Sequence, residues 1–439
     1  MIDTHQLKKR DLYLNKILAF QDTEPVKVVT GIRRCGKSSL LKLMTLHLRE
    51  HGIAEDQILE MNFESYAFKN MNSDSFYQYV QEHIIPNKRM YLFFDEVQRV
   101  PKWEDAINSF RVDFNCDIYV TGSNAYMLSS EYATYLSGRC VEIKMLPLSF
   151  SEFLAFYDFE IKETKSALGG TRKQVFDQTG EHYELREVFD AYMRFGGMPG
   201  IADVGLDQEK ALVLLEGIYP TVIMRDILER ENRKGQKRIT DPVLLKKIVM
   251  FLADNIGSNI SVSSIGNTLV NEGLLEDDRR KGTPSAHTVQ AYVNALLESY
   301  FFYDIKRFDI KGKEFLRTLG KYYIVDIGLR NYLLGFRDRD SGHAIENVVY
   351  FELLRRGYDV SIGKIDNSEV DFIATNTNDK MYVQVTEAMT SEDVRKRELA
   401  PLQKISDNYE KIVLSLNPGM DSSYDGIKSI NLIDWLISV

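Results

Sequence analysis

The hydrophobic pattern of the first 150 residues alternates between short apolar runs and longer segments with helical spacing. Five short runs are predicted to be strands: residues 26–30, 58–63, 90–94, 118–121 and 141–146. After the first run, apolar side chains recur at the three- and four-residue spacing of a helix face. The continuously apolar third run is typical of a parallel strand covered on both faces. The pattern therefore predicts an α/β domain with a parallel five-stranded sheet over residues 1–150.

Helical spacing dominates the middle of the chain. We expect helices at 151–156, 185–195, 211–231, 244–255 and 288–300, with a glycine-containing loop at 169–171. Two strand-like runs, 301–305 and 322–326, follow the last helix, and helices followed by a two-stranded ribbon indicate a winged helix. The sequence thus predicts an all-α/winged-helix region, with a helical linker or lid domain at 151–235 and a winged-helix domain at 236–335.

The last hundred residues return to an alternating pattern. Strands are expected at 360–363, 370–375, 382–386 and 412–416, and helices at 344–356 and 392–409. This pattern predicts a small, separate α/β domain over residues 336–439.

Composition narrows the class of protein. The 439 residues include 55 Lys and Arg against 64 Asp and Glu, for a net charge of −9, which argues against a protein that coats nucleic acid. The three cysteines, Cys35, Cys116 and Cys140, show no metal-ligand spacing, so reduced thiols are expected. The polar N-terminus lacks the pattern of a secretory signal, and no apolar run reaches membrane-spanning length. We therefore expect a cytoplasmic protein without a membrane partner.

The strongest motif fits the phosphate-binding pattern G-x-x-x-x-G-K-[ST] and lies between a predicted strand and a predicted helix: Gly31-Ile32-Arg33-Arg34-Cys35-Gly36-Lys37-Ser38, followed by Ser39. Its glycines allow main-chain N–H groups to surround phosphate oxygens at the start of a helix. Lys37 supplies a charge for the β- and γ-phosphates, and Ser38 supplies a hydroxyl for Mg²⁺. The loop predicts ATP and Mg²⁺ as cofactors.

Two carboxylates follow the apolar run at 90–94, at the strand end where open α/β sheets bind ligands. Asp95 is expected in the Mg²⁺ shell, and Glu96 is expected to deprotonate the attacking water. Ser123 and Asn124 follow the next predicted strand, and of the two we choose Asn124 to position that water. Arg139 precedes the last strand and is placed to project at a neighbouring nucleotide.

These motifs resemble those of prokaryotic AAA+-type ATPases in which a P-loop domain precedes a helical and winged-helix domain of unknown function. The resemblance extends to four further segments: 146–153, 195–199, 225–228 and 326–330. It implies the strand order 5-1-4-3-2 and assigns Arg139 to the position of an arginine finger that acts in trans. It therefore also implies a homo-oligomer.

The C-terminal domain resembles the restriction-endonuclease-like fold of the PD-(D/E)xK superfamily. Glu346 and Asp371 match two of its expected acidic positions, while Gln384 and Thr386 stand where the pattern has an acid and a lysine. A neutral amide binds Mg²⁺ weakly, and threonine supplies no positive charge. Glu387 is expected to face the other side of its strand. We therefore predict a degenerate nuclease-like domain without activity.

Several basic residues make DNA a candidate partner of the predicted winged helix: Lys306, Arg307, Lys311, Lys313, Arg317 and Lys321. A solvated hairpin or a protein-binding module fits these residues equally well. The leading hypothesis is an ATP-driven switch or remodeller that acts on an unknown protein or DNA partner. The alternatives are an ATP-gated DNA endonuclease and a DNA-binding regulator that uses ATP for assembly.

Overall fold

The computed structural model describes residues 7–125, 138–165, 171–219, 227–228, 239–271, 284–337, 340–419 and 422–438. The chain forms two compact units. The first unit contains residues 1–146 together with 298–300, and the second contains residues 147–297 together with 301–439.

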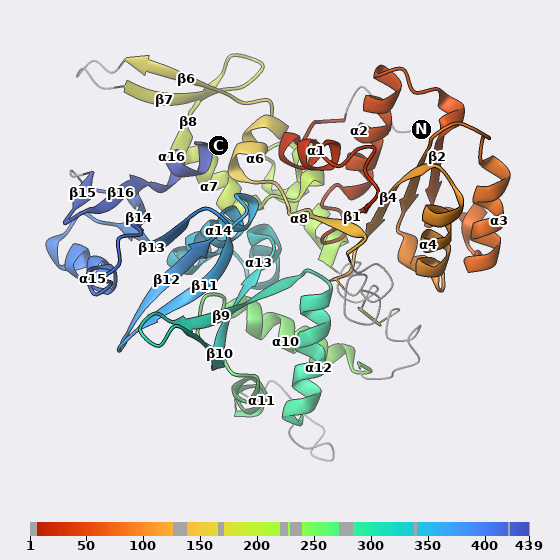
Figure 1. Cartoon of the computed structure of the whole chain (residues 1–439). Helices are drawn as coiled ribbons and strands as arrows, with labels where there is room; N and C mark the ends of the chain where they lie inside the picture. The colour runs from red at the N-terminus through yellow and green to blue at the C-terminus, as the bar shows by residue number, and fades with distance from the viewer. Residues whose placement is uncertain are drawn as a thin grey trace. The chain divides into compact units, whose positions relative to one another are not determined.

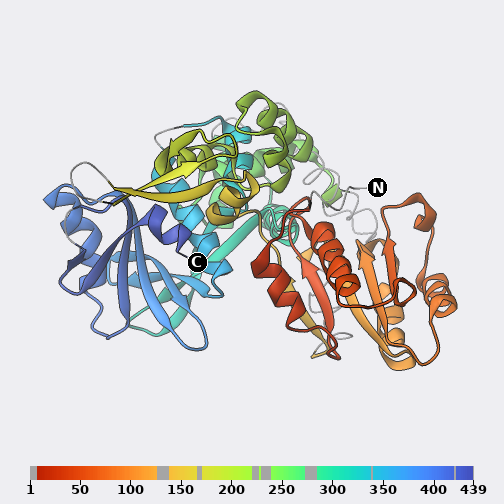
Figure 2. The ribbon, with the colours of Figure 1, turned by 90° about the horizontal axis from the view of Figure 1, so that it is seen from above.

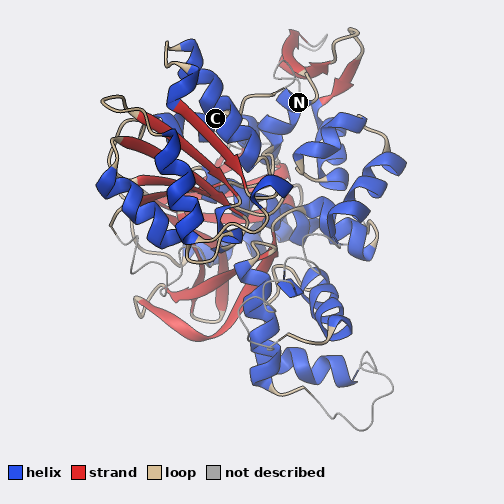
Figure 3. Ribbon diagram, turned by 90° about the vertical axis from the view of Figure 1, so that its right-hand side faces the viewer, coloured by secondary structure: helices blue, strands red, loops and turns tan. Residues whose placement is uncertain are grey.

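The first unit is built on a five-stranded sheet whose neighbouring strands are all parallel. Its strands are β1 Val26–Thr30, β2 Ile58–Asn62, β3 Met90–Asp95, β4 Cys116–Gly122 and β5 Cys140–Lys144. The spatial order β5-β1-β4-β3-β2 confirms the predicted order. β1 therefore lies between β4 and β5, and because the strands are parallel, the loops after β1, β3 and β4 leave the sheet on the side of the strands' carboxyl ends (Figure 1). Figure 3 shows the helices and strands of the chain in separate colours.

Helices cover both faces of this sheet (Figure 2). They are α1 Asp11–Leu18, α2 Lys37–Glu50, α3 Ser73–His83 and α4 Trp103–Asp113, with short 3₁₀ turns η2 Glu55–Gln57, η3 Tyr66–Phe68 and η4 Val97–Arg99. α3 and α4 pack together, and Phe76 and Phe110 from them join Phe94 of β3 in one buried aromatic cluster. Burial of these aromatic side chains anchors the strand that carries Asp95 at its end.

The second unit begins with helices and a small sheet. Its first helices are α6 Phe150–Phe156, α7 Leu185–Phe195, η6 Pro199–Val204, α8 Gln208–Tyr219, α10 Pro242–Asp254, α11 Val262–Asn271, α12 Ala286–Glu298 and α13 Ile327–Leu334. The expected all-helical character of 151–235 is wrong, because β6 Glu160–Lys165, β7 Thr171–Phe176 and β8 His182–Glu184 form an antiparallel sheet. The motif at 225–228 lies mostly outside the described residues.

An eight-stranded sheet of order β10-β9-β11-β12-β13-β14-β16-β15 forms the rest of this unit. Its strands are β9 Phe302–Asp309, β10 Glu314–Ile324, β11 Asp359–Ile365, β12 Ser368–Thr375, β13 Lys380–Ala388, β14 Glu410–Asn417, β15 Ser423–Tyr424 and β16 Ile427–Asn431. The accompanying helices are α14 Ser341–Arg355, α15 Glu392–Gln403 and α16 Leu432–Ile437.

The predicted two-stranded ribbon is present as β9 and β10, which pair antiparallel directly after α12. β9 also pairs with β11 in parallel, so the eight-stranded sheet crosses the domain boundary expected at residue 336. No helix within the described ranges combines the length and the apolar character that a membrane crossing requires.

Candidate functional site

The loop between β1 and α2 has the backbone geometry that its glycines predict. Gly31 adopts a φ of +143°, and a Cβ atom there would lie 2.1 Å from the carbonyl oxygen of Met145. Gly36 adopts a φ of +104° immediately before α2 begins at Lys37. A side chain at either position would be strained, so the two glycines fix the loop at the N-terminus of α2.

Lys37 lies inside this loop. Its side chain is 4% exposed, and its ammonium donates hydrogen bonds of 3.0 Å to the carbonyl oxygens of Gly31 and Ile32. Both of these hydrogen-bond partners are neutral carbonyl oxygens, and the charge of Lys37 also interacts with the nearby carboxylate of Asp95. An anion that enters the loop therefore meets an ammonium already held in place.

Asp95, at the end of β3, lies beside the loop. Thr121 of β4 donates its hydroxyl to one carboxylate oxygen of Asp95, and Asn62 of β2 donates to the other at 3.1 Å. Burial raises the pKa of Asp95, while hydrogen bonds from Thr121 and Ser38 act in the opposite direction. Ser38 and Asp95, the two residues predicted to serve Mg²⁺, are therefore hydrogen-bonded neighbours.

Glu96 follows Asp95 with a φ of +55°, in the left-handed region that residues other than glycine seldom adopt. Its main-chain N–H donates to Thr121 Oγ1 at 2.9 Å. Its side-chain Oε2 accepts hydrogen bonds from Gln98 at 2.5 Å and from Ser123 at 3.2 Å. The described hydrogen bond from the end of β4 to Glu96 comes from Ser123, and the role chosen for Asn124 stays a prediction.

Three arginines in or beside the loop have contacts or backbone angles that the motif alone does not predict. Arg33 pairs with Glu64 at 2.6 Å, and Arg34 has a φ of 66°. Arg10, which is 3% exposed, donates to the carbonyl oxygens of Cys35 and Leu146. Local sequence gives no signal for Arg10, because its contacts with residues 35 and 146 depend on the fold.

The donor set fits a nucleotide with Mg²⁺. The α2 N-terminus and Lys37 would hold the phosphates, Ser38 and Asp95 would hold the metal ion, and the bound ion would neutralise phosphate charge. The side chain of Arg139 is exposed, and its carbonyl oxygen accepts a hydrogen bond from Val26 at the start of β1.

Three of the four predicted degenerate nuclease residues, Glu346, Asp371 and Gln384, form a cluster within the second unit, and Thr386 lies further along β13 opposite Ser415 of β14. Lys321 of β10 is 4% exposed and contacts Glu346 at 2.9 Å and Glu369 at 2.7 Å. Tyr323 donates its hydroxyl to Glu346 as well. Burial opposes the charge of Lys321, but nearby carboxylates outweigh it and raise the pKa of the ammonium.

Asp371 and Gln384 are linked to each other in this cluster. Asp371 accepts a hydrogen bond from the main chain of Val385 at 2.8 Å, and its own N–H donates to Gln384 at 3.4 Å. Burial and the charge of Glu346 raise the pKa of Asp371 well above its usual range. The side-chain amide of Gln384 donates to Glu398 of α15 at 3.2 Å. Among the residues that the structure describes, no group of three or more acidic, histidine or cysteine side chains has the geometry of a metal site.

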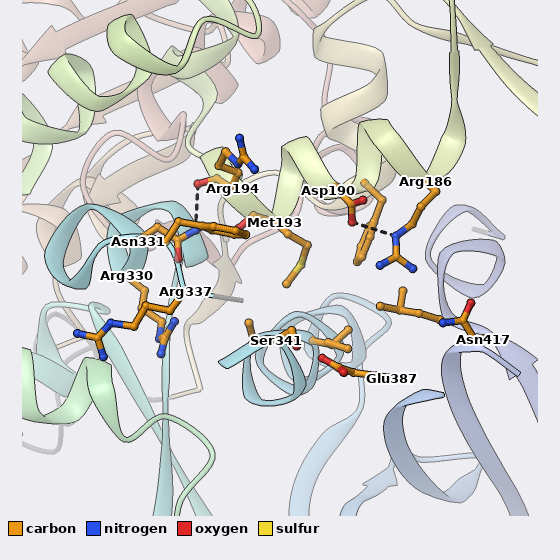
Figure 4. Close-up of a pocket in the computed structure, with 15 residues that line it drawn as sticks. Arg186, Asp190, Met193, Arg194, Arg330, Asn331, Arg337, Ser341, Glu387 and Asn417 are labelled. Carbon is orange, nitrogen blue, oxygen red and sulfur yellow. Dashed lines mark hydrogen bonds and ion pairs between the residues drawn. The ribbon is translucent and has the colours of Figure 1, made fainter. Parts of the chain in front are cut away.

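A cavity of about 410 Å³ in the second unit is lined by side chains from α7, α13, α14 and the ends of β13 and β14 (Figure 4). Its arginines already have partners: Arg186 pairs with Asp190, Arg330 with Asp340, and Arg337 with Asp254. Glu387 of β13 lines this cavity, whereas Gln384 of the same strand donates to Glu398. The two side chains thus serve opposite faces of the strand, as the alternation of strand side chains predicts.

Comparison with protein families agrees with this site. Residues 23–154 match a family model described as an AAA domain, and residues 186–340 match a domain of unknown function (DUF8612). The first unit therefore contains an AAA-type P-loop ATPase domain, as predicted. The whole chain is 37% identical to an uncharacterized protein of Haemophilus influenzae over 98% of both chains. The chain belongs to the same family as that protein.

An uncharacterized protein of Methanocaldococcus jannaschii is 28% identical, over 92% of this chain and 84% of its own length. Among solved structures, a Walker-type ATPase of Pyrococcus abyssi aligns with 74% of this chain and 95% of its own. Its sequence identity is 17%, and the TM-score is 0.47.

Proposed function

We propose that this protein binds ATP with Mg²⁺ and hydrolyses it. The observation that carries the proposal is the pairing of Lys37 with neutral carbonyl oxygens, beside a hydrogen-bonded Ser38 and Asp95. A buried ammonium is stabilised by a direct anionic partner, and a bound triphosphate would provide Lys37 with one. Bound Mg²⁺ would bridge phosphate oxygens and stabilise charge that develops during transfer.

Glu96 is the proposed base for the attacking water. Its carboxylate lies one residue beyond Asp95 and is oriented by Gln98 and Ser123. Glu96→Gln is expected to retain ATP binding and to lower turnover by about 10²–10⁴-fold, because an amide does not accept the proton. Titration with ATP and a phosphate-release assay test both parts. Wild-type turnover in this variant would exclude Glu96 as the base.

Arg139 is proposed as an arginine finger that acts on ATP bound to a second copy of the chain. Its exposed side chain next to β5 supports this role. Arg139→Ala is expected to leave ATP affinity nearly unchanged and to lower turnover by about 10³–10⁵-fold. Turnover per chain should also rise with protein concentration. Concentration-independent turnover by a sedimenting monomer with ATP bound would contradict the proposal.

We propose that ATP operates a switch or remodeller, with the second unit as the part that engages a protein or DNA partner. The order α10, α11, α12, β9, β10 supports a winged helix. Two of the basic residues counted for DNA are engaged elsewhere, however, since Lys321 is buried among acids and Lys311 pairs with Asp366 at 2.6 Å. Turnover measured with and without duplex DNA tests DNA as the partner. Stimulation by DNA would support DNA as the partner of the switch, whereas DNA binding without any change in turnover would favour the regulator alternative.

The C-terminal end is proposed to be a nuclease-like fold without nuclease activity. The element order α14, β11, β12, β13, α15, β14, with β13 and β14 parallel, supports the resemblance to restriction endonucleases. Lys321 contacts Glu346 and Glu369, so the cluster contains the positive charge that Thr386 lacks. The endonuclease alternative is still the weaker one, because Gln384 stands where the pattern has an acid and its amide is bonded to Glu398.

A further inference from the structure

The short turn η4, directly after Glu96, carries two side chains that reach in different directions. Gln98 donates its amide to Glu96 Oε2 at 2.5 Å and also lies 3.4 Å from the hydroxyl of Ser123. Ser123 donates to the same carboxylate oxygen at 3.2 Å. Within the described residues both hydrogen bonds from side chains end on Oε2, so Oε1 keeps its lone pairs for a proton.

The neighbouring residue on this turn connects it to the phosphate-binding loop. Arg99 contacts Glu64 Oε1 at 2.7 Å, and Arg33 of the loop contacts the same oxygen at 2.6 Å. Glu64 therefore joins the loop to the turn that carries Gln98. Without its negative charge the two guanidinium groups would repel each other, and the turn would lose its tie to the loop.

We propose that Gln98 is a positioning residue that fixes Glu96 for proton abstraction, and that Glu64 holds this arrangement in register with the phosphate-binding loop. The inference rests on the proposed ATPase function. The amide carbonyl of Gln98 is buried without a hydrogen-bond partner among the described residues. Leaving that oxygen unpaired costs free energy, so the contact with Glu96 outweighs an orientation that would satisfy it.

The two bonds of Gln98 and Ser123 also explain how Glu96 tolerates its left-handed backbone. Strained residues persist where the surrounding structure holds them, and Glu96 is held at its main chain by Thr121 and at its side chain by Gln98 and Ser123. Loss of Gln98 removes one of three restraints without removing any group that contacts the phosphate-binding loop.

The test compares kcat, KM and nucleotide affinity in five variants of the full chain. Gln98→Met keeps the side-chain length but has no donor, and we expect kcat to fall by about 10–100-fold while KM and affinity stay unchanged. Glu64→Gln is expected to give a smaller fall in kcat. Gln57→Met and Glu55→Gln are matched controls. The first loses a hydrogen bond from its side-chain amide to the carbonyl oxygen of Arg89, and the second loses an ion pair with Arg49.

Thermal unfolding of each variant identifies any loss of fold. Gln98→Asn provides a second variant at this position, because the shorter asparagine side chain does not reach Glu96. Wild-type kcat in both Gln98 variants would overturn the proposal. So would a change in KM or affinity with unchanged kcat, which would place Gln98 in binding instead of positioning. If the wild-type chain binds and hydrolyses ATP, these outcomes overturn only the role of Gln98. If the wild-type chain does neither, the proposed function fails as well.

Discussion

Lys37 and Lys321 are equally buried, each 4% exposed, yet they have opposite electrostatic surroundings. Lys37 in the first unit contacts two carbonyl oxygens, whereas Lys321 in the second unit contacts two carboxylates. A buried ammonium in direct contact with carboxylates is satisfied by the fold, whereas one whose hydrogen bonds go to carbonyl oxygens can still take an anion as a direct partner. The comparison separates a binding site from a structural ion cluster that has similar residue types.

Lys27 supports this distinction within the first unit. It is fully buried on β1, pairs with Asp117 on β4, and carries no signature of a ligand site. Lys27 and Lys37, the buried lysines among the described residues of the first unit, are thus of different kinds, and burial alone does not distinguish them.

The largest effect is expected at Lys37. Lys37→Ala should remove measurable binding of a non-hydrolysable ATP analogue with Mg²⁺, because no other ammonium takes the place of its charge in the loop. Isothermal titration measures the affinity, and Lys42→Ala, on the same helix, is the control that should bind normally. Unchanged affinity of Lys37→Ala would remove the assignment of the loop as a phosphate site.

The second-largest effect is expected on the stability of the fold when Lys321 is replaced, without an effect on ATP binding. Lys321→Met leaves the buried Glu346 without its cation, and removal of one partner of a buried pair costs about 3–5 kcal/mol. Urea unfolding measures this cost, and ATP affinity should not change. Lys311→Met, which breaks an exposed pair with Asp366, should cost about 1 kcal/mol or less. Equal losses in the two variants would show that the cluster does not depend on its lysine.

The buried carboxyl group of Asp326 extends the comparison to the dependence of stability on pH. Asp326 accepts hydrogen bonds only from main-chain N–H groups, of Gly197 at 2.6 Å and Leu329 at 3.0 Å, in the contacts described, and burial raises its pKa to about 6. The folded state therefore binds this proton more tightly than the unfolded state. Its contribution to stability is most favourable below pH 4 and is lost as pH rises to about 6.

The expected loss is about 3 kcal/mol between pH 4 and pH 7, from a shift of about two pKa units. Asp326→Asn removes this titration, so the difference in unfolding free energy between wild type and variant should change by that amount over the same interval. Urea unfolding at the two pH values measures it, with Asp241→Asn at the N-cap of α10 as the control for the same substitution at another helix cap. A pH-independent difference would contradict the raised pKa.

The sequence predicted those parts of the fold and site that depend on local pattern. The phosphate-binding loop, Asp95 and Glu96 each lie within a few residues of the strand that positions them, and the parallel sheet follows from apolar runs. Glu64 and Arg10 were not predicted as site residues, and Lys321 was predicted as a candidate for DNA binding and not for the acidic cluster, because each meets its partners across distant parts of the chain. The β6–β8 sheet was missed because its strands are short and mostly polar, as in Glu160–Lys165, and lack the regular alternation of a half-buried strand.

The smallest expected effect is the absence of DNA cleavage, and it follows from the same comparison. An active nuclease of this fold needs acids that hold a metal ion, and a lysine that helps to activate water. Here the buried Lys321 ammonium already neutralises Glu346, and the amide of Gln384 is bonded to Glu398. Linear, supercoiled and branched DNA should therefore stay intact with Mg²⁺ or Mn²⁺, with or without ATP. Metal-dependent nicking that Asp371→Ala abolishes and Lys37→Ala retains would show that the cluster still binds a catalytic metal, and would favour the endonuclease alternative.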